Sequence, residues 1–486
     1  MERPATSPTL LLSLIPVFFL IALLILNVTL FGDAASSGAN QVALLLTAIL
    51  AGGIGHFWLG MNYRDIEQRA IKSIVLAMEA VIILLIVGAL IGLWIMSGVV
   101  PTMLYYGILL INPTVFLIVA CVICSIVSLA IGSSWSTMGT VGIALIGIGK
   151  ALGFPEALVA GAIVSGAYLG DKMSPLSDTT NLAPAVAGTN LFTHIRHMLY
   201  TTVPAYILTL IIFGGIGLFY TAHEMPATMI EDLAQALQQE FHIAWYLLLI
   251  PLVVIVAAAA RIPAIPTLVF GAILGGATAV FFQPGVFDAT GPAGIYAQII
   301  ATAYSGFASE TGNTMLDALL SRGGMMNMFG TIVLIVMAML FGGAMEATGM
   351  LPRIAGTILR TVRGAGSLIA ATIATCVVFN FTASDQYLAI VIPGRMFRQA
   401  YETFKLEPRN LSRALEDGAT VTSVLVPWNT CGAFAASVLA VSTLDYAPFC
   451  FFNLLCPVVS VTMAGFHIAI KYIDAPSQSE PTPPVP

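Results

Sequence analysis

An apolar segment is interrupted by two carboxylates, a lysine, five hydroxyl side chains and a proline at residues 166–181, which read G-A-Y-L-G-D-K-M-S-P-L-S-D-T-T-N. Carboxylate, hydroxyl and amide oxygens, together with carbonyls that the proline frees from helix bonding, are the hard ligands that an alkali cation needs. We therefore predict a cation site here. Its candidate ligands in this segment are Asp171, Asp178, Thr179, Thr180 and Asn181.

The other half of the chain contains a corresponding polar interruption. N-F-T-A-S-D at 380–385 and P-W-N-T-C-G at 427–432 both break apolar runs. They add the candidate ion-binding residues Thr382, Asp385, Asn429 and Thr430. The alternative interpretation makes Asp171 and Lys172 an interfacial salt bridge and the prolines mere kinks. The polarity of the cluster and its counterpart in the second half favour the site.

An aspartate in such a site can couple two ions. A desolvated carboxylate holds a proton tightly, whereas a bound cation displaces that proton. Asp171, Asp178 and Asp385 are the candidates for this exchange, with sodium expected at Asp171 and Asp178. Lys172 is either an internal cation that leaves when sodium arrives or a structural residue, and the sequence leaves both open. Asp171→Asn and Asp178→Asn are each predicted to abolish transport while leaving folding intact.

Further polar residues are predicted to support the site or to line its approaches. Glu310, Asn313 and Asp317 are spaced for one helix face, which is either solvated or an outer gate. His194 and His197 are spaced for a pH sensor, although a solvated or headgroup-facing position is favoured. The other supporting candidates are Ser133, Ser134, Ser136, Thr137, Ser174, Ser177, Asp417 and Trp428.

The composition places this chemistry in a membrane. Of 486 residues, 58% are hydrophobic and 9% are charged, whereas a soluble domain carries about 25% charged residues. The mean hydropathy is +0.95. The net charge of −6 argues against nucleic-acid binding, which needs a basic face. Because no phosphate loop, nucleophile triad or metal-ligand set is found, neither an enzyme nor a resident cofactor is expected. The six cysteines lie in apolar surroundings and are interpreted as small hydrophobic residues.

Apolar runs of bilayer-spanning length predict an all-α polytopic fold. Eight continuous spans are predicted at 10–31, 42–59, 74–100, 198–222, 243–260, 267–283, 327–348 and 449–472. Two broken spans, 157–187 and 417–441, bring the crossings to about ten. Residues 112–150 and 366–396 are apolar at both ends and polar in the middle, which predicts two re-entrant hairpins. Residues 406–417 are predicted to form an interfacial helix before the second broken span.

The order of these elements predicts two repeats of inverted topology, which is the pattern of a secondary transporter. The first repeat covers 1–222, an extracytoplasmic linker covers 223–242, and the second repeat covers 243–474. A disordered tail follows at 475–486. Lysine and arginine gather in alternate loops, which predicts that both termini are cytoplasmic.

The chain resembles the NhaC-type sodium/proton antiporter family of the ion transporter superfamily. The resemblance rests on 166–181 with its continuation to His194, on 305–324, 385–387, 411–417 and 427–432. It implies sodium/proton exchange across a bacterial inner membrane and a core of hairpins and broken helices. It also implies, more weakly, a homodimer. The same family includes members that resemble malate/lactate exchangers and amino-acid carriers.

The sequence thus predicts a secondary antiporter that exchanges sodium for protons by alternating access. An organic anion exchanger of the same fold is the alternative; it would need a cation for the carboxylate, and Lys172 is the one inside the central cluster. A channel or a structural membrane protein is the third class, which the broken helices argue against.

Overall fold

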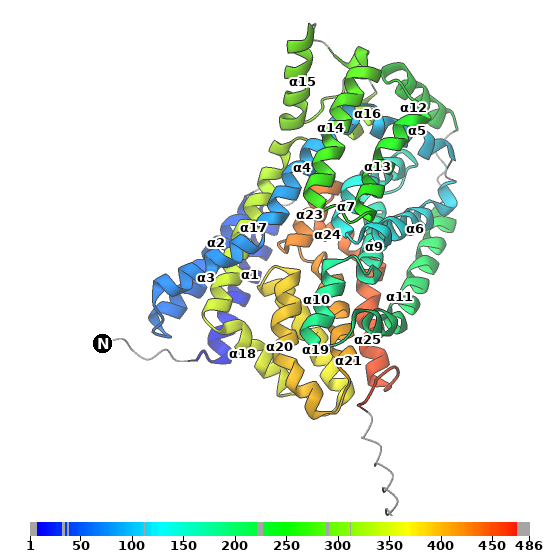
Figure 1. Cartoon of the computed structure of the whole chain (residues 1–486). Helices are drawn as coiled ribbons and strands as arrows, with labels where there is room; N and C mark the ends of the chain where they lie inside the picture. Colours follow the sequence, from blue (N-terminus) through cyan, green and yellow to red (C-terminus); the bar gives the residue numbers. More distant parts are fainter. Residues whose placement is uncertain are drawn as a thin grey trace, which may run out of the picture.

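The computed structural model describes residues 7–31, 35, 38–110, 112–220, 227–287, 291–311 and 313–473. Within these ranges every regular element is a helix, and the β pairing found there is an isolated bridge between Leu406 and Tyr472. The predicted all-α class is therefore confirmed (Figure 1). The tail at 475–486 lies outside the described residues.

Eight helices in the described part of the chain are long and apolar enough to cross a bilayer, or up to ten if two sharply bent pairs count as spans. Six coincide with predicted spans: α1 (Leu10–Phe31), α2 (Ala39–Phe57), α3 with α4 (Tyr63–Leu76 and Met78–Met96), α11 (Leu191–Tyr220), α14 (Ala264–Phe282) and α17 (Phe329–Ala347). The other two, α6 (Pro113–Ile131) and α19 (Ala365–Thr382), are the first arms of the predicted hairpins. The polytopic membrane architecture is thus confirmed.

The predicted span 243–260 is a short helical segment that follows a sharp bend in the chain. Its residues form η4 (Trp245–Leu248) and α13 (Leu249–Ala259), which meet α12 (Ala227–Glu240) at 87°. The predicted span 449–472 is a shorter helix, α25 (Phe451–Gly465). The connecting helices are α5 (Val99–Leu110), η5 (Pro284–Val286), α15 (Gly291–Ser305), α16 (Thr314–Leu320), η6 (Met325–Met328), α18 (Met350–Leu359), α24 (Thr443–Tyr446) and η8 (Ala447–Phe449).

Each half contains a hairpin followed by a broken helix. In the first half, α6 turns at Gly132 into α7 (Ser134–Thr137), η2 (Met138–Gly142) and α8 (Ile143–Ala151). The broken helix is α9 (Glu156–Met173) followed by α10 (Asp178–Ala187). In the second half, α19 turns into α20 (Gln386–Thr403), and the broken helix comprises α21 (Pro408–Leu415), η7 (Glu416–Thr420), α22 (Val421–Ser423) and α23 (Thr430–Leu439). In Figure 1, α7, α9, α23 and α24 gather in the middle of the molecule, with α19, α20 and α21 below them.

Two predictions about boundaries are wrong for a shared reason. The second broken span begins at Pro408 rather than at 417, and the predicted interfacial helix is its first half, because residues 410–415 are buried. The span predicted at 198–222 begins at Leu191, so that His194 and His197, 0% and 2% exposed, are inside the protein rather than on a solvated face. His194 Nδ1 lies 2.8 Å from Ser412 Oγ. The two polar segments therefore bury each other.

The close packing of α6 on α9 fixes the position of the first break. A Cβ atom on Gly166 would lie 2.1 Å from the carbonyl oxygen of Cys121, and one on Gly170 would lie 2.5 Å from that of Ser125. Small residues allow two helix backbones to approach this closely. Ser128 Oγ then donates to the carbonyl of Ala167 across the same contact, at 2.6 Å. The end of α9 is thereby held against the hairpin.

Candidate functional site

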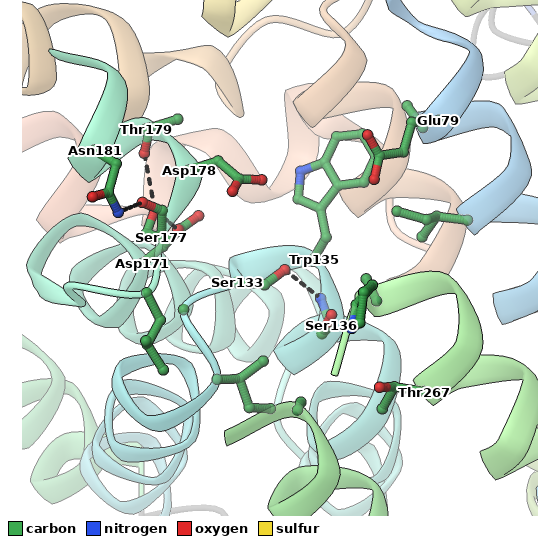
Figure 2. A pocket seen from close by; sticks show the side chains of 18 of the residues that line it. Glu79, Ser133, Trp135, Ser136, Asp171, Ser177, Asp178, Thr179, Asn181 and Thr267 are labelled. Carbon is green, nitrogen blue, oxygen red and sulfur yellow. Dashed lines mark hydrogen bonds between the residues drawn. The ribbon is translucent and has the colours of Figure 1, made fainter. Parts of the chain in front are cut away.

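A cavity of about 720 Å³ lies where the first hairpin, the first break and the start of α20 meet (Figure 2). Residues from both halves of the chain line it. Its polar lining comprises Glu79, Ser133, Ser136, Thr140, Asp171, Ser177, Asp178, Thr179, Asn181, Arg261, Thr267, Asp385, Gln386, Tyr387 and Thr430. Nine of the residues predicted from the sequence are therefore gathered in one place.

Asp171 fastens the break to the tip of the first hairpin. One carboxylate oxygen, Oδ2, accepts from the Ser134 hydroxyl at 2.6 Å and from the Ser134 backbone N–H at 3.2 Å. The other, Oδ1, accepts from the Ser177 hydroxyl at 2.6 Å. Ser177 Oγ lies in turn 3.2 Å from Thr179 Oγ1. These three donated hydrogen bonds offset part of the cost of burying the carboxylate.

The backbone of the first break is satisfied from within the segment. Pro175 has no N–H, so the carbonyl of Asp171 loses the helix bond that residue 175 would otherwise provide. Thr180 Oγ1 lies 3.0 Å from the Asp171 carbonyl and 2.9 Å from that of Lys172, and it can donate to either. Asn181 Nδ2 donates to the carbonyls of Pro175 and Ser177, at 2.9 and 2.7 Å. Irregular backbone in a membrane protein requires such internal partners. In this conformation the side chains of Thr180 and Asn181 therefore donate hydrogen bonds to backbone carbonyls.

Asp178 is an unengaged carboxylate of the cavity, as is Glu79 in the part of the chain that the structure describes. It is the first residue of α10 and is exposed. No hydrogen bond or ion pair to its side chain is found among the described residues. Figure 2 shows its carboxylate extending from α10 toward Trp135, away from the Asp171, Ser177 and Thr179 group. Asp178 is therefore placed to meet an ion that enters the cavity.

The second half contributes Asp385 and Thr430. Asp385 is the N-cap of α20, and its Oδ1 accepts from the backbone N–H groups of Tyr387 and Leu388 at 2.9 and 3.1 Å. Thr430 Oγ1 donates to Asp385 Oδ2 at 3.3 Å, and the Thr430 backbone N–H donates to the carbonyl of Ser384 at 3.0 Å. The second hairpin is thus tied to the second break, as Asp171 ties the first.

Other predicted residues hold this framework together and do not line the cavity. Thr382 Oγ1 donates to the Val378 carbonyl at 2.7 Å, and Trp428 Nε1 donates to that of Phe381 at 2.8 Å. Asn429 accepts from the Cys431 N–H as the N-cap of α23. Ser134, Thr137 and Ser174 bond within or beside the first hairpin.

The predicted face of Glu310, Asn313 and Asp317 does not form. The helix α16 begins at Thr314, so the first two residues precede it. Asp317 accepts from the hydroxyls of Ser309 and Thr311, both within 3.0 Å, and from the Thr311 N–H. The Asp317 carboxylate therefore stabilises the loop that precedes α16. None of the three residues lines the cavity.

Lys172 points away from the cavity and pairs with Asp417 of the second half. Its Nζ lies 2.5 Å from Asp417 Oδ1, and both side chains are fully buried. It also donates to Thr202 Oγ1 at 2.8 Å and lies 3.2 Å from Cys456 Sγ. Asp171 and Lys172 are adjacent in sequence, yet one is bonded to the first hairpin and the other to the second broken helix. The predicted Asp171–Lys172 salt bridge, the alternative weighed above, is absent among the described residues.

Several cavity residues were not predicted. Glu79 and Arg261 face the cavity from α4 and from the turn after α13. A lone acid at the start of an otherwise apolar run was the available signal for Glu79. Trp135 stacks on Phe434, with ring centroids 4.2 Å apart and an interplanar angle of 15°, and so joins the first hairpin to α23.

The cavity offers oxygen ligands rather than a cluster of strong metal ligands. Among the described residues, no three histidine, cysteine, aspartate or glutamate side chains converge closely enough to hold one ion. An ion at Asp171 or Asp178 would therefore be completed by hydroxyl, carbonyl or water oxygens. Such a ligand set suits sodium, which needs no soft or nitrogen donor.

Comparison with known proteins agrees with the resemblance seen in the sequence. A family model described as the Na+/H+ antiporter family matches residues 166–467. The Na(+)/H(+) antiporter NhaC of Alkalihalophilus pseudofirmus is 39% identical over 431 residues, which cover 88% of this chain and 91% of the relative.

Two other relatives carry names with organic substrates. The malate-2H(+)/Na(+)-lactate antiporter of Bacillus subtilis is 40% identical over 426 residues, covering 88% of each chain. The arginine/ornithine antiporter ArcD of Halobacterium salinarum is 34% identical over 479 residues, covering 98% of this chain and 96% of the relative. All three relatives are antiporters by name. The membrane-spanning helices, the two broken helices that are bonded to hairpins and these matches lead to one conclusion. The chain is an integral membrane transporter that belongs to the Na+/H+ antiporter family.

Proposed function

We propose that this protein exchanges sodium ions for protons across the bacterial inner membrane by alternating access. The observation that supports this best is the meeting of three aspartates in one cavity, two from the first chain break and one from the tip of the second hairpin. Asp178 is the unengaged aspartate among these three and serves as the first ligand for sodium. Asp171 lies behind it with its hydroxyl partners. Asp385 and Thr430 close the site from the other half.

Exchange follows from competition at these carboxylates. A proton neutralises an aspartate and removes its attraction for a cation, whereas a bound sodium ion displaces the proton. Alternating access then delivers each ion to the opposite side. The membrane potential can supply enough energy for this exchange. One net charge that moves through 100 mV releases about 2.3 kcal/mol. Transport of an ion against a tenfold concentration difference costs about 1.4 kcal/mol.

The alternative proposal is an exchanger of organic ions. A cavity of about 720 Å³ is larger than a bare sodium ion needs, and one relative is named for malate and lactate. Lys172 is engaged with Asp417 and does not line the cavity, so a carboxylate substrate would have to meet Arg261. Four carboxylates line the same cavity, namely Glu79, Asp171, Asp178 and Asp385. This excess of negative charge favours a cation as the principal occupant.

The test uses purified protein in liposomes that contain a pH-sensitive dye. A pulse of sodium chloride should move protons in the wild type and should have no effect in Asp178→Asn. Sodium malate, sodium lactate and arginine pulses follow in the same vesicles. If protons move only when an organic ion is present, the sodium/proton assignment is wrong and the organic exchanger replaces it.

Dimerisation and two cytoplasmic termini remain predictions from the sequence and the family. Cross-linking in native membranes and protease access to tags at each terminus would test them.

A further inference from the structure

The π-helical turn η7 contains a carboxylic acid that is buried without a partner. Glu416 is 0% exposed, and neither of its carboxylate oxygens has a hydrogen-bond partner of normal geometry among the described residues; the Thr420 hydroxyl is the polar side chain that interacts with it from the same turn. An ionised carboxylate costs several kcal/mol to bury unless it is paired. A proton on Glu416 removes that cost. π-Helical turns are rare, and they are found frequently at functional sites.

A guanidinium lies one helical turn before this carboxyl group and is also incompletely paired. Arg413 is 0% exposed, and its Nη1 donates to the carbonyl of Ala469 at 3.0 Å. Its Nε and Nη2 atoms have no partner in the described part of the chain. Residues three apart on a helix are neighbours, yet no ion pair joins Arg413 to Glu416 among the described residues. The two groups are thus close in the chain and separate in this conformation.

Besides its chain neighbours α21 and α22, the helices packed against η7 are α9, α10, α19, α20 and α25; α10 carries Asp178, whose carboxylate lies in the cavity. The ionisable groups that interact within this region are Asp171 and Lys172 on α9, Cys376 on α19, Tyr401 on α20, Cys456 on α25, and Arg413 and Asp417 beside Glu416. Lys172 and Asp417 neutralise each other. When Asp171 is ionised it offsets Arg413, so the group is neutral while Glu416 holds a proton and carries one net negative charge once that proton is released.

We infer that Glu416 carries the exchanged proton, at a site separate from the cavity, and releases it when its carboxylate pairs with Arg413. This rests on the proposed sodium/proton exchange and refines it: the cavity aspartates keep the sodium site, and Glu416 replaces them as the carrier of the proton. In the step, the carboxylic O–H bond breaks, the proton passes to water in the alternate conformation, and the carboxylate accepts N–H bonds from the guanidinium. Nothing is oxidised or reduced.

Sodium is coupled to this step through Asp171 and Lys172. A sodium ion at Asp171 adds positive charge beside Lys172, which belongs to the same buried group of charges. Release of the Glu416 proton offsets that addition. The cavity thus binds the sodium ion, and Glu416 in η7 releases the proton.

The test separates sodium movement from proton movement in the same vesicles. In Glu416→Gln, sodium/sodium exchange followed with ²²Na⁺ at equal pH should persist, while sodium-driven proton release should fall to the level of protein-free liposomes. Glu416→Asp should restore part of the proton release. Glu402→Gln, which changes an exposed carboxylate on α20, should leave both movements unchanged.

Three outcomes decide between the proposals. Unaltered proton release in Glu416→Gln overturns the inference, and so does the loss of both movements in a variant that remains folded. Absence of sodium-driven proton release in the wild type overturns the proposed function instead. If Glu416→Gln does not fold, infrared difference spectra of the wild type replace it. Sodium should remove the carbonyl band of a protonated carboxylic acid, and Glu416→Asp should shift that band; a spectrum without it contradicts the inference.

Discussion

Asp171 and Asp178 look equivalent in the sequence, but the structure gives them different surroundings. Asp171 accepts three hydrogen bonds from Ser134 and Ser177. Asp178 accepts none within the described residues. The first carboxylate therefore contributes to the architecture as well as to the site, whereas the second is free to act on an ion.

This difference predicts different stabilities for two alanine variants. Asp171→Ala leaves buried donors of Ser134 and Ser177 without acceptors, at about 1–3 kcal/mol for each unsatisfied group. It should lower the unfolding temperature in detergent, whereas Asp178→Ala should leave it almost unchanged. Both variants should be inactive in the liposome assay. Equal unfolding temperatures for the two would show that the Asp171 bonds contribute nothing to stability.

At the scale of the elements, the site depends on helices that approach one another through glycine. The α6–α9 contact has no room for a methyl group at Gly166, where a Cβ would meet the Cys121 carbonyl at 2.1 Å. Any separation of these helices also moves Asp171 away from Ser134, because Asp171 is at the end of α9.

Gly166→Ala should therefore reduce both stability and exchange. The matched control is Gly215→Ala on α11, where an added Cβ meets no atom within 4 Å. At an unhindered helical position the change from glycine to alanine stabilises by about 0.4–1 kcal/mol. Thermal unfolding and sodium-driven proton release measured on both variants check this. Wild-type behaviour of Gly166→Ala would mean that the two helices can separate without harm.

At the scale of the whole molecule, the buried Lys172–Asp417 pair links the two halves. Removal of one partner from a buried ion pair costs about 3–5 kcal/mol, whereas apolar replacement of both can be neutral. Lys172→Met and Asp417→Leu should each destabilise the protein strongly, and the double variant should recover much of the loss. The exposed Arg398–Glu402 pair is the control, because such pairs contribute about 0–1 kcal/mol. Additive losses in the double variant would contradict direct coupling.

The sequence was a good guide where a signal is local. Apolar length identified α1, α2, α11, α14 and α17, and Pro175 with its polar neighbours identified the first break. It failed at 406–417, because charges there suggested a water-facing helix. Arg413, Glu416 and Asp417 are nevertheless buried, and Asp417 meets Lys172, some 245 residues earlier. The local composition of a segment cannot reveal a partner so far away in the sequence. The burial of His194 beside Ser412 could not be predicted for the same reason.

The stacking of Trp135 on Phe434 has a practical consequence. Of the five tryptophans, Trp58 and Trp245 are exposed on the surface, Trp94 is buried in an apolar core, and Trp428 packs edge-on against Phe381. Trp135 lines the cavity, faces Asp178 and touches a helix of the other half. An indole in that position responds both to the charge of an occupant and to separation of its aromatic neighbour. The protein therefore contains its own optical probe, and its fluorescence can time ion arrival and the opening movement without any attached label.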